Sequence, residues 1–213
     1  MSTRILARSP GYLVRMRTLA ELRAAAADCT ACELHADATQ TVFGQGRCGA
    51  ALVLVGEQPG DREDVEGEPF VGPAGRLLDR ALDQAGITRE DAYVTNVVKH
   101  FRFRREGKRR IHRPPGTEHV RACLPWLHAE LAAVRPKVLV TLGATAANAL
   151  LGSSFRLTRH RGEIQEYLDL PLVATIHPSA VLRGPEERRQ EMFDELVADL
   201  ALAGRTAAQQ RSA

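Results

Sequence analysis

The sequence has few of the features that mark membrane-spanning or secreted proteins. No hydrophobic run is long enough to cross a bilayer, and the first residues, MSTRILARSPGYLVRMR, lack the continuous apolar stretch of a secretory signal. Four cysteines in 213 residues are too few for a disulfide scaffold, which leaves metal ligation or ordinary burial as their roles. We expect a monomeric, cytoplasmic protein that makes no contact with a membrane.

Net positive charge is also low, at +3 for the whole chain, but basic residues are concentrated in one segment. Between Lys99 and Arg113, eight Lys or Arg residues accompany only one carboxylate, that of Glu106. Such a local concentration suits a nucleic-acid footprint, although a solvated charge run is the common alternative. The letters KRRIH place His112 at the expected tip of this loop, where an imidazole beside a DNA backbone can act as acid, base or nucleophile.

Apolar runs alternate with helical patterns along the chain, without internal repeats or a clear linker. We expect strands at residues 51–56, 93–98, 137–142 and 172–176, and helices at residues 18–27, 73–85, 117–134, 143–151 and 185–203. Near-continuous apolar strands separated by helices predict an α/β fold of three layers, α/β/α, around a central, mostly parallel, four-stranded sheet. Residues 1–17 are expected to form an N-terminal extension, 18–204 a single domain, and 205–213 a flexible tail.

Ligands of parallel sheets bind beyond the carboxyl ends of the strands, so the residues after each strand are the candidates for function. The segment after the first strand, GEQPGDREDVEGEPFVGPAGRLLD, is rich in glycine but lacks Gly-Lys-Ser/Thr and the dinucleotide spacing, which makes nucleotide binding a runner-up. It is also acidic, with Glu57 at the strand end. An acidic loop facing a basic one fits a substrate with phosphates outside and a cationic transition state inside, as in glycosidic cleavage.

Several motifs occur together in order, namely GEQPG with EGEPFVGPAGRLLD, then YVTNVVKH, then the CLPWL segment at Cys123, then HPSAVLR. From about Cys29 to the closing helix, they resemble the family-4 uracil-DNA glycosylases. Gln58, where that family usually has alanine, and the insertion carrying KRRIH resemble the UdgX branch, whose members bind uracil-DNA covalently. The resemblance implies a uracil-DNA glycosylase-like fold and a DNA-repair hydrolase whose partner is uracil-containing DNA, single-stranded or duplex.

The resemblance also assigns roles in base recognition. Phe70 would stack on a flipped uracil, and Asn96 would read its Watson–Crick edge. His177 would hydrogen-bond the uracil oxygen that gains charge as the base leaves, while Ser179 and Arg183 would grip phosphates. Without the surrounding motifs, core packing would be favoured for Phe70 and a turn cap for Asn96. An isolated His-Pro is otherwise a strand terminator, and an ordinary helix start would look similar to the Ser179 and Arg183 segment. The other expected substrate-binding residues are Gly56, Gln58 and Asp61.

The chemistry is expected to centre on Glu57 and His112. An ionised Glu57 would stabilise the oxocarbenium ion and orient or deprotonate the imidazole. A ring nitrogen of His112 would then capture C1′ in place of water, which leaves a covalent sugar–imidazole adduct. Arg110 would anchor the loop through phosphate or carboxylate contacts, with a solvated arginine as the alternative.

The cysteines indicate a second site. The resemblance implies a four-iron, four-sulfur cluster, with His100 standing where the family has its remaining cysteine. Imidazole can replace thiolate at iron, so the implied ligands are Cys29, Cys32, His100 and Cys123. The spacing alone would equally allow Cys48 as the fourth ligand, or a zinc site. We interpret Cys48 as an ordinary small core residue before the first strand.

Three functions stay open at this point. The first is a glycosylase that ends as a covalent complex with DNA. The second is a conventional family-4 enzyme that releases uracil over many turnovers, and the third is a noncatalytic iron–sulfur DNA-binding protein. The last is disfavoured because binding alone does not need Glu57, Asn96 and His177 gathered at strand ends.

Overall fold

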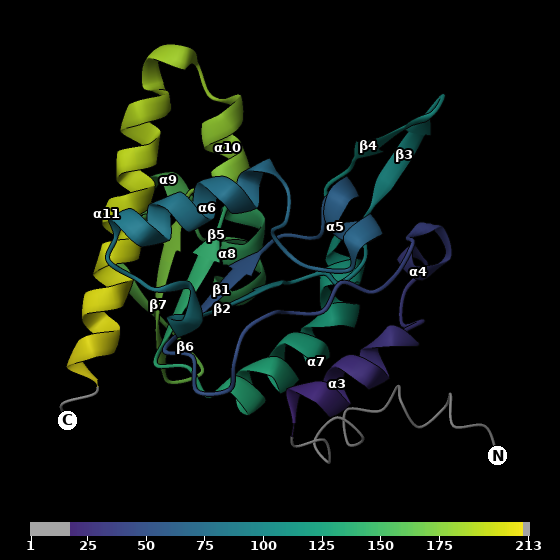
Figure 1. Cartoon of the computed structure of the whole chain (residues 1–213), viewed down its shortest axis with the longest axis horizontal. Helices are drawn as coiled ribbons and strands as arrows, with labels where there is room; N and C mark the ends of the chain where they lie inside the picture. The colour runs from purple at the N-terminus through teal and green to yellow at the C-terminus, as the bar shows by residue number, and fades with distance from the viewer. Residues whose placement is uncertain (1–17, 211–213) are drawn as a thin grey trace.

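The computed structural model describes residues 18–210, so the predicted extension at 1–17 lies outside the described residues. Five strands form the central sheet in the order β2-β1-β5-β7-β6 (Figure 1). Four of them are parallel, and β6 pairs with β7 in the antiparallel sense. They are β1 (Leu52–Gly56), β2 (Ala92–Asn96), β5 (Val138–Leu142), β6 (Ile164–Tyr167) and β7 (Leu170–Thr175). The three-layer α/β prediction is confirmed, with five strands in place of the expected four.

The additional strand, β6, escapes sequence analysis because it lies at the sheet edge and is only partly buried. Its hairpin with β7 turns through Leu168 and Asp169, which both have positive φ angles of 51° and 60°. Two-residue hairpin turns of this kind usually carry Asn-Gly or Asp-Gly, so Leu-Asp gives no turn signal.

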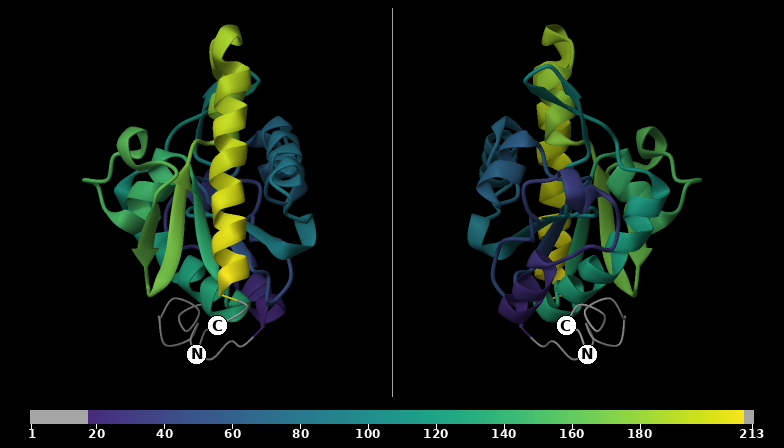
Figure 2. Two further views of the ribbon diagram at one scale, coloured as in Figure 1. Left: turned by 90° about the vertical axis from the view of Figure 1, so that its left-hand side faces the viewer. Right: turned by 90° about the vertical axis from the view of Figure 1, so that its right-hand side faces the viewer.

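The helices cover both faces of the sheet. Figure 2 shows helices on both sides of the sheet. Alternate β1 side chains point to opposite sides: Leu52 and Leu54 pack with α6 (Pro73–Gln84) and α11 (Arg189–Gln209), whereas Val53 and Val55 pack with α7 (Thr117–Val134) and α8 (Ala144–Leu151). The helices are α3 (Leu19–Ala27), α4 (Leu34–Asp37), α5 (Asp61–Glu66), α6 (Pro73–Gln84), α7 (Thr117–Val134), α8 (Ala144–Leu151), α9 (Leu157–His160), α10 (Pro178–Arg183) and α11 (Arg189–Gln209), with 3₁₀ turns at η1 (Arg89–Asp91) and η2 (Glu186–Arg188). Within residues 18–210, none is long and apolar enough to cross a membrane.

The closing helix differs from its expected bounds. It begins at Arg189 because residues 186–188 form a separate 3₁₀ turn, and it continues to Gln209. Residues 205–209 of the expected flexible tail are therefore helical.

The basic segment is a two-stranded hairpin that stands away from the sheet, with β3 (Phe103–Glu106) paired to β4 (Arg109–His112) (Figure 1). Gly107 has a φ of 58° in the turn between the strands, a conformation that favours glycine. The register pairs His112 with Phe103, so the imidazole lies at the base of the hairpin. The expected position at the tip is wrong, because pairing of the two strands leaves only Gly107 and Lys108 there.

Candidate active site

A cleft of about 590 Å³ opens at the carboxyl edge of the parallel strands. Gly56, Asp61 and Arg110 do not line it, although they were predicted with the site residues. Glu63 and Thr145 line it and were missed, although both lie in segments that follow strands. The predicted residues that line the cleft are Glu57, Gln58, Phe70, Asn96, His112, His177, Ser179 and Arg183.

Glu57 and His112 approach each other in this cleft. The Nε2 atom of His112 lies 3.3 Å from Oε1 of Glu57. Burial raises the pKa of the Glu57 carboxyl, but hydrogen bonds from His112 and Thr145 outweigh it and leave that pKa below its ordinary value. The carboxylate is therefore ionised at neutral pH, and it is placed to orient the imidazole or to accept its proton.

Gln58 fixes the base of the hairpin beside that carboxylate. Its Nε2 donates to the backbone carbonyls of Arg102 and Arg113 at 3.2 and 3.0 Å, and its Oε1 accepts from the backbone N–H of Arg102 at 3.2 Å. Arg102 and Arg113 flank the two strands of the hairpin. Because Gln58 follows Glu57 directly, its bonds to the hairpin also fix the position of the Glu57 backbone relative to that hairpin. An alanine at this position would lack all three bonds.

Arg110 holds the hairpin against α5. Its Nε lies 2.5 Å from Oδ1 of Asp61, and its Nη1 lies 2.6 Å from Oδ2 of Asp64. Asp64 is fully buried and also accepts two hydrogen bonds from the backbone N–H of Thr39. Arg110 was predicted to contact phosphate or carboxylate groups, and the structure contains the contacts with carboxylates. Its contact with phosphate and the binding of substrate by Asp61 stay predictions.

Phe70 and Asn96 form a wall of the cleft around Gly56. A Cβ atom at Gly56 would lie 2.3 Å from Oδ1 of Asn96 and 2.8 Å from Cζ of Phe70, so only glycine permits this approach. Phe70 has a φ of 59°, which is unusual for a bulky residue, and a Cβ at Gly75 would collide with its carbonyl oxygen. Two glycines thus allow the ring and the amide to line one cleft, as the proposed stacking and edge reading require.

His177 is held as a neutral imidazole. Its Nδ1 accepts a hydrogen bond from the backbone N–H of Ser179 at 3.1 Å, which places the ring proton on Nε2. Burial lowers the pKa of His177 to about 4, so the ring is uncharged at neutral pH. The Ser179 hydroxyl lies 2.7 Å from the same Nδ1. Contacts of Ser179 and Arg183 with phosphates stay predictions.

Three of the four predicted metal ligands come together. The thiols of Cys32 and Cys123 hydrogen-bond to one another, which lowers the pKa of Cys32 and raises that of Cys123, and His100 lies beside Cys32. Cys29 is buried and accepts a hydrogen bond from Nε1 of Trp126 at 3.3 Å. Nδ1 of His100 is buried and has no hydrogen bond of ordinary geometry within residues 18–210. A buried imidazole nitrogen that lies beside the Cys32 thiol and has no hydrogen bond of ordinary geometry fits a cluster ligand.

Cys48 is exposed, so its interpretation as a core residue is wrong. It lies in the turn before β1, between Gly46 and Gly49, which both have positive φ angles. This turn keeps Cys48 outside the core that begins two residues later at Ala50.

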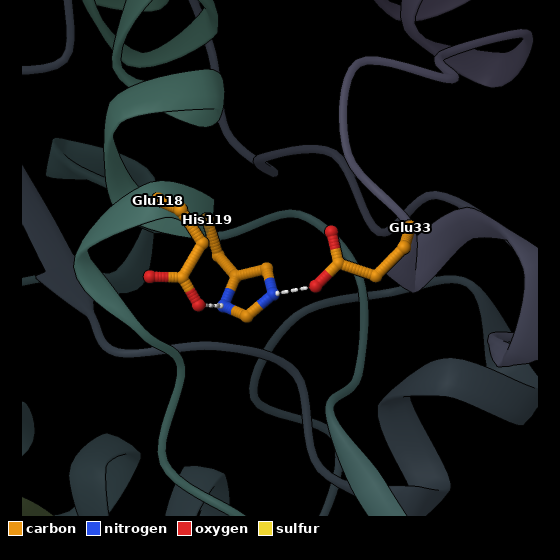
Figure 3. Close-up of side chains that lie close together, drawn as sticks. All are labelled: Glu33, Glu118 and His119. Atoms are coloured by element: carbon orange, nitrogen blue, oxygen red, sulfur yellow. Dashed lines mark hydrogen bonds and ion pairs between the residues drawn. The ribbon is translucent and has the colours of Figure 1, made fainter.

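Glu33, Glu118 and His119 also lie close enough together to hold a metal ion (Figure 3). However, Nδ1 of His119 accepts the backbone N–H at the N-cap of α7 at 2.7 Å, and its Nε2 donates to Oε1 of Glu33 at 2.6 Å. Both ring nitrogens therefore have partners already. We interpret the group as a brace that joins the segment at Cys32 to the helix that carries Cys123.

Comparison with known proteins matches residues 43–201 to the family described as the Uracil DNA glycosylase superfamily. A type-4 uracil-DNA glycosylase of Thermotoga maritima is 41% identical over 171 residues, which cover 79% of this chain and 85% of that protein. A type-4 enzyme of Archaeoglobus fulgidus is 37% identical over 174 residues, covering 78% and 84%. One of Pyrobaculum aerophilum is 35% identical over 175 residues, covering 78% and 86%.

Proposed function

The chain belongs to the uracil DNA glycosylase superfamily, and from this premise we propose that it excises uracil from DNA in the manner of the UdgX branch, remaining joined to the sugar through His112. The type-4 uracil-DNA glycosylases among its relatives support the excision. The observation that supports the covalent step is the 3.3 Å approach of His112 Nε2 to the Glu57 carboxylate inside the cleft. A nitrogen nucleophile next to a base is the arrangement that covalent catalysis needs.

Uracil recognition would occur at the wall formed by Phe70 and Asn96. A base flipped out of the DNA stacks on the ring, and the carboxamide offers a donor and an acceptor to its Watson–Crick edge. The Nε2–H of neutral His177 donates to the uracil oxygen that becomes negative as the base departs. Because the imidazole is uncharged beforehand, it stabilises the leaving anion without repelling the sugar cation.

The capture step uses the proton between His112 and Glu57. The bond from C1′ to the base nitrogen breaks, and its electron pair leaves with uracil. Glu57 stabilises the sugar cation and accepts the Nε2 proton of His112, while the Nε2 electron pair forms the new bond to C1′. The products are a uracil anion, a protonated Glu57 and a neutral N-alkyl imidazole, so charge and atoms balance.

The hairpin would bring the DNA backbone to this cleft. Arg105, Lys108 and Arg109 are exposed on it, whereas Arg110 is held by carboxylates. Exposed cations bind phosphates without regard to base sequence, so they set position and affinity while the cleft sets specificity.

We further propose that Cys29, Cys32, His100 and Cys123 hold a four-iron, four-sulfur cluster, which the buried position of His100 Nδ1 beside the Cys32 thiol supports. When bound, such a group would supply metal–ligand bonds that cross-link three segments of the chain. His100 lies four residues after Asn96, so the ligands would stiffen the wall of the uracil site.

A denaturing gel with uracil-containing single-stranded DNA tests the proposed function. A heat-stable, retarded band that is absent with thymine in place of uracil is the expected result. DNA that is cleaved after alkali without a retarded band would identify a conventional, multiple-turnover glycosylase. Unchanged DNA would identify a noncatalytic binding protein and would overturn the proposal.

A further inference from the structure

A buried ion pair joins the segment after β2 to helix α7. Nζ of Lys99 lies 2.5 Å from Oε2 of Glu130, and neither side chain has any exposed surface. The other carboxylate oxygen of Glu130 accepts hydrogen bonds from the Tyr93 hydroxyl, the Thr95 hydroxyl and the backbone N–H of Gly44, each at 3.0 Å. Burying two charges costs free energy even when they are paired, so a contribution to folding stability does not by itself explain this ion pair. A role of the pair in the neighbouring site would explain it.

The Lys99 ammonium hydrogen-bonds to the backbone of Asn96, the residue proposed to recognise the base. Its three donors go to Glu130, to the Thr95 hydroxyl at 2.6 Å, and to the backbone carbonyl of Asn96 at 2.7 Å. An ammonium has only three protons, so its hydrogen-bonding capacity is fully used. The N–H of the same peptide group, that of Val97, donates to the carbonyl of Gly56 at 2.9 Å. Both polar groups of the peptide that follows Asn96, its carbonyl and its N–H, are therefore hydrogen-bonded, which fixes the backbone at this residue.

The tolerance for movement of Asn96 is small. Its Oδ1 lies so close to Gly56 that a Cβ there would not fit, and the Phe70 ring also approaches that position, with Cζ 2.8 Å from such a Cβ. A displacement of the Asn96 backbone would change the amide's distance from the stacked base directly. Misplacement by about 1 Å can cost on the order of 100-fold in rate.

We propose that Lys99 and Glu130 are positioning residues of the glycosylase, which act through the Asn96 carbonyl to hold its carboxamide in register with the uracil edge. The inference rests on the proposed function and adds the residues that set its base-reading geometry. Neither side chain lines the cleft, so neither touches the substrate.

The test variant is Lys99→Met with Glu130→Gln, which removes both charges at similar volume and keeps an amide for the partners of Glu130. Neutral replacements of a buried pair are often tolerated, so the double variant avoids the unpaired charge that either single change would leave. The expected result is a loss of about 100-fold in the single-turnover rate of uracil release at saturating DNA. Affinity for uracil-free DNA should be unchanged, because the exposed hairpin cations are intact.

Two controls separate positioning from stability. Leu200→Ala, on the buried face of α11, lowers the melting temperature without touching this network and should leave the rate within a few-fold. In a double-mutant cycle with Asn96→Ala, the Lys99 and Glu130 changes should add little further loss, since they act through a side chain that is already gone.

The positioning role would be overturned if the Lys99→Met/Glu130→Gln change reduced the rate equally in the wild-type and Asn96→Ala backgrounds. A wild-type rate in the Lys99→Met/Glu130→Gln variant would overturn it as well. Iron content is measured alongside, because Lys99 precedes His100. Loss of iron from the double variant would assign the pair to cluster retention and contradict the proposal. Failure of the wild-type protein to release uracil would instead overturn the proposed function, and this inference with it.

Discussion

Glu57→Gln should impair uracil release and adduct formation together. Glutamine keeps the size of the side chain but removes the charge that the carboxylate presents to the sugar cation and to His112. A unit charge about 4 Å from a cation, at an effective dielectric constant of about 20, contributes about 4 kcal/mol. If that interaction is made mainly in the transition state, the single-turnover rate should fall about 1000-fold.

The assay follows free uracil and the covalent DNA complex in parallel, under conditions where enzyme exceeds DNA. Glu66→Gln is the matched control, because Glu66 belongs to the same acidic segment, at the end of α5, and its ion pair within residues 18–210 is with exposed Arg62. Its rate should stay close to that of the wild type. A Glu57→Gln rate within tenfold of the wild type, or loss of the adduct with normal uracil release, would refute the shared role of the carboxylate.

Further predictions concern four other side chains. In a folded Asn96→Ala protein, uracil processing should fall by orders of magnitude, because a polar pocket that loses a partner discriminates strongly, and normal activity would contradict the pocket assignment. His100→Ala should reduce bound iron and the brown absorbance of the purified protein, while Cys48→Ala, an exposed site, should not; the reverse pattern would exclude the proposed ligands. Since the pKa of His177 is lowered to about 4 in the folded state, its contribution to stability should be complete above about pH 6.5 and decline as pH falls towards 4. The advantage of the wild type over His177→Asn in free energy of unfolding should shrink over that range, and an advantage that grows on acidification would contradict the burial argument. His112→Ser should abolish the adduct yet allow uracil release, and loss of both would show that capture drives bond cleavage.

The positions of Glu57, Asn96 and His177 follow from sequence because each stands at or just after a strand of a parallel sheet, and parallel strands present those ends at one edge. Short, strongly apolar runs make such strands easy to locate. The bounds of β1, β2, β5 and β7 accordingly agree with the expected ones to within two residues.

The hairpin and its anchors depend on contacts that no local pattern contains. Arg110 meets Asp61 and Asp64 across 49 and 46 residues of chain, so these carboxylate contacts are decided by the tertiary fold. Gln58 reaches the hairpin stem across 44 and 55 residues. From sequence, a basic run predicts a loop that binds phosphates. In the folded chain, Arg110 of this run bonds to carboxylates and holds the hairpin in place.

The buried polar groups were the least predictable. Lys99 belongs to the basic run by sequence, but the structure buries it completely against Glu130, which lies 31 residues away on a helix. A lysine in a charged segment is normally solvated, so only the tertiary structure separates Lys99 from its basic neighbours.

Mass spectrometry of the digested protein–DNA complex tests the covalent linkage most directly. The wild-type protein is incubated with a short uracil-containing oligonucleotide, denatured, digested with protease and nuclease, and its peptides are fragmented. The account predicts that the deoxyribose remnant is attached to the imidazole of His112, and that no modified peptide is recovered from His112→Ser. A remnant on any other peptide, or an unmodified His112 in a heat-stable complex, would contradict the assignment of this histidine as the nucleophile.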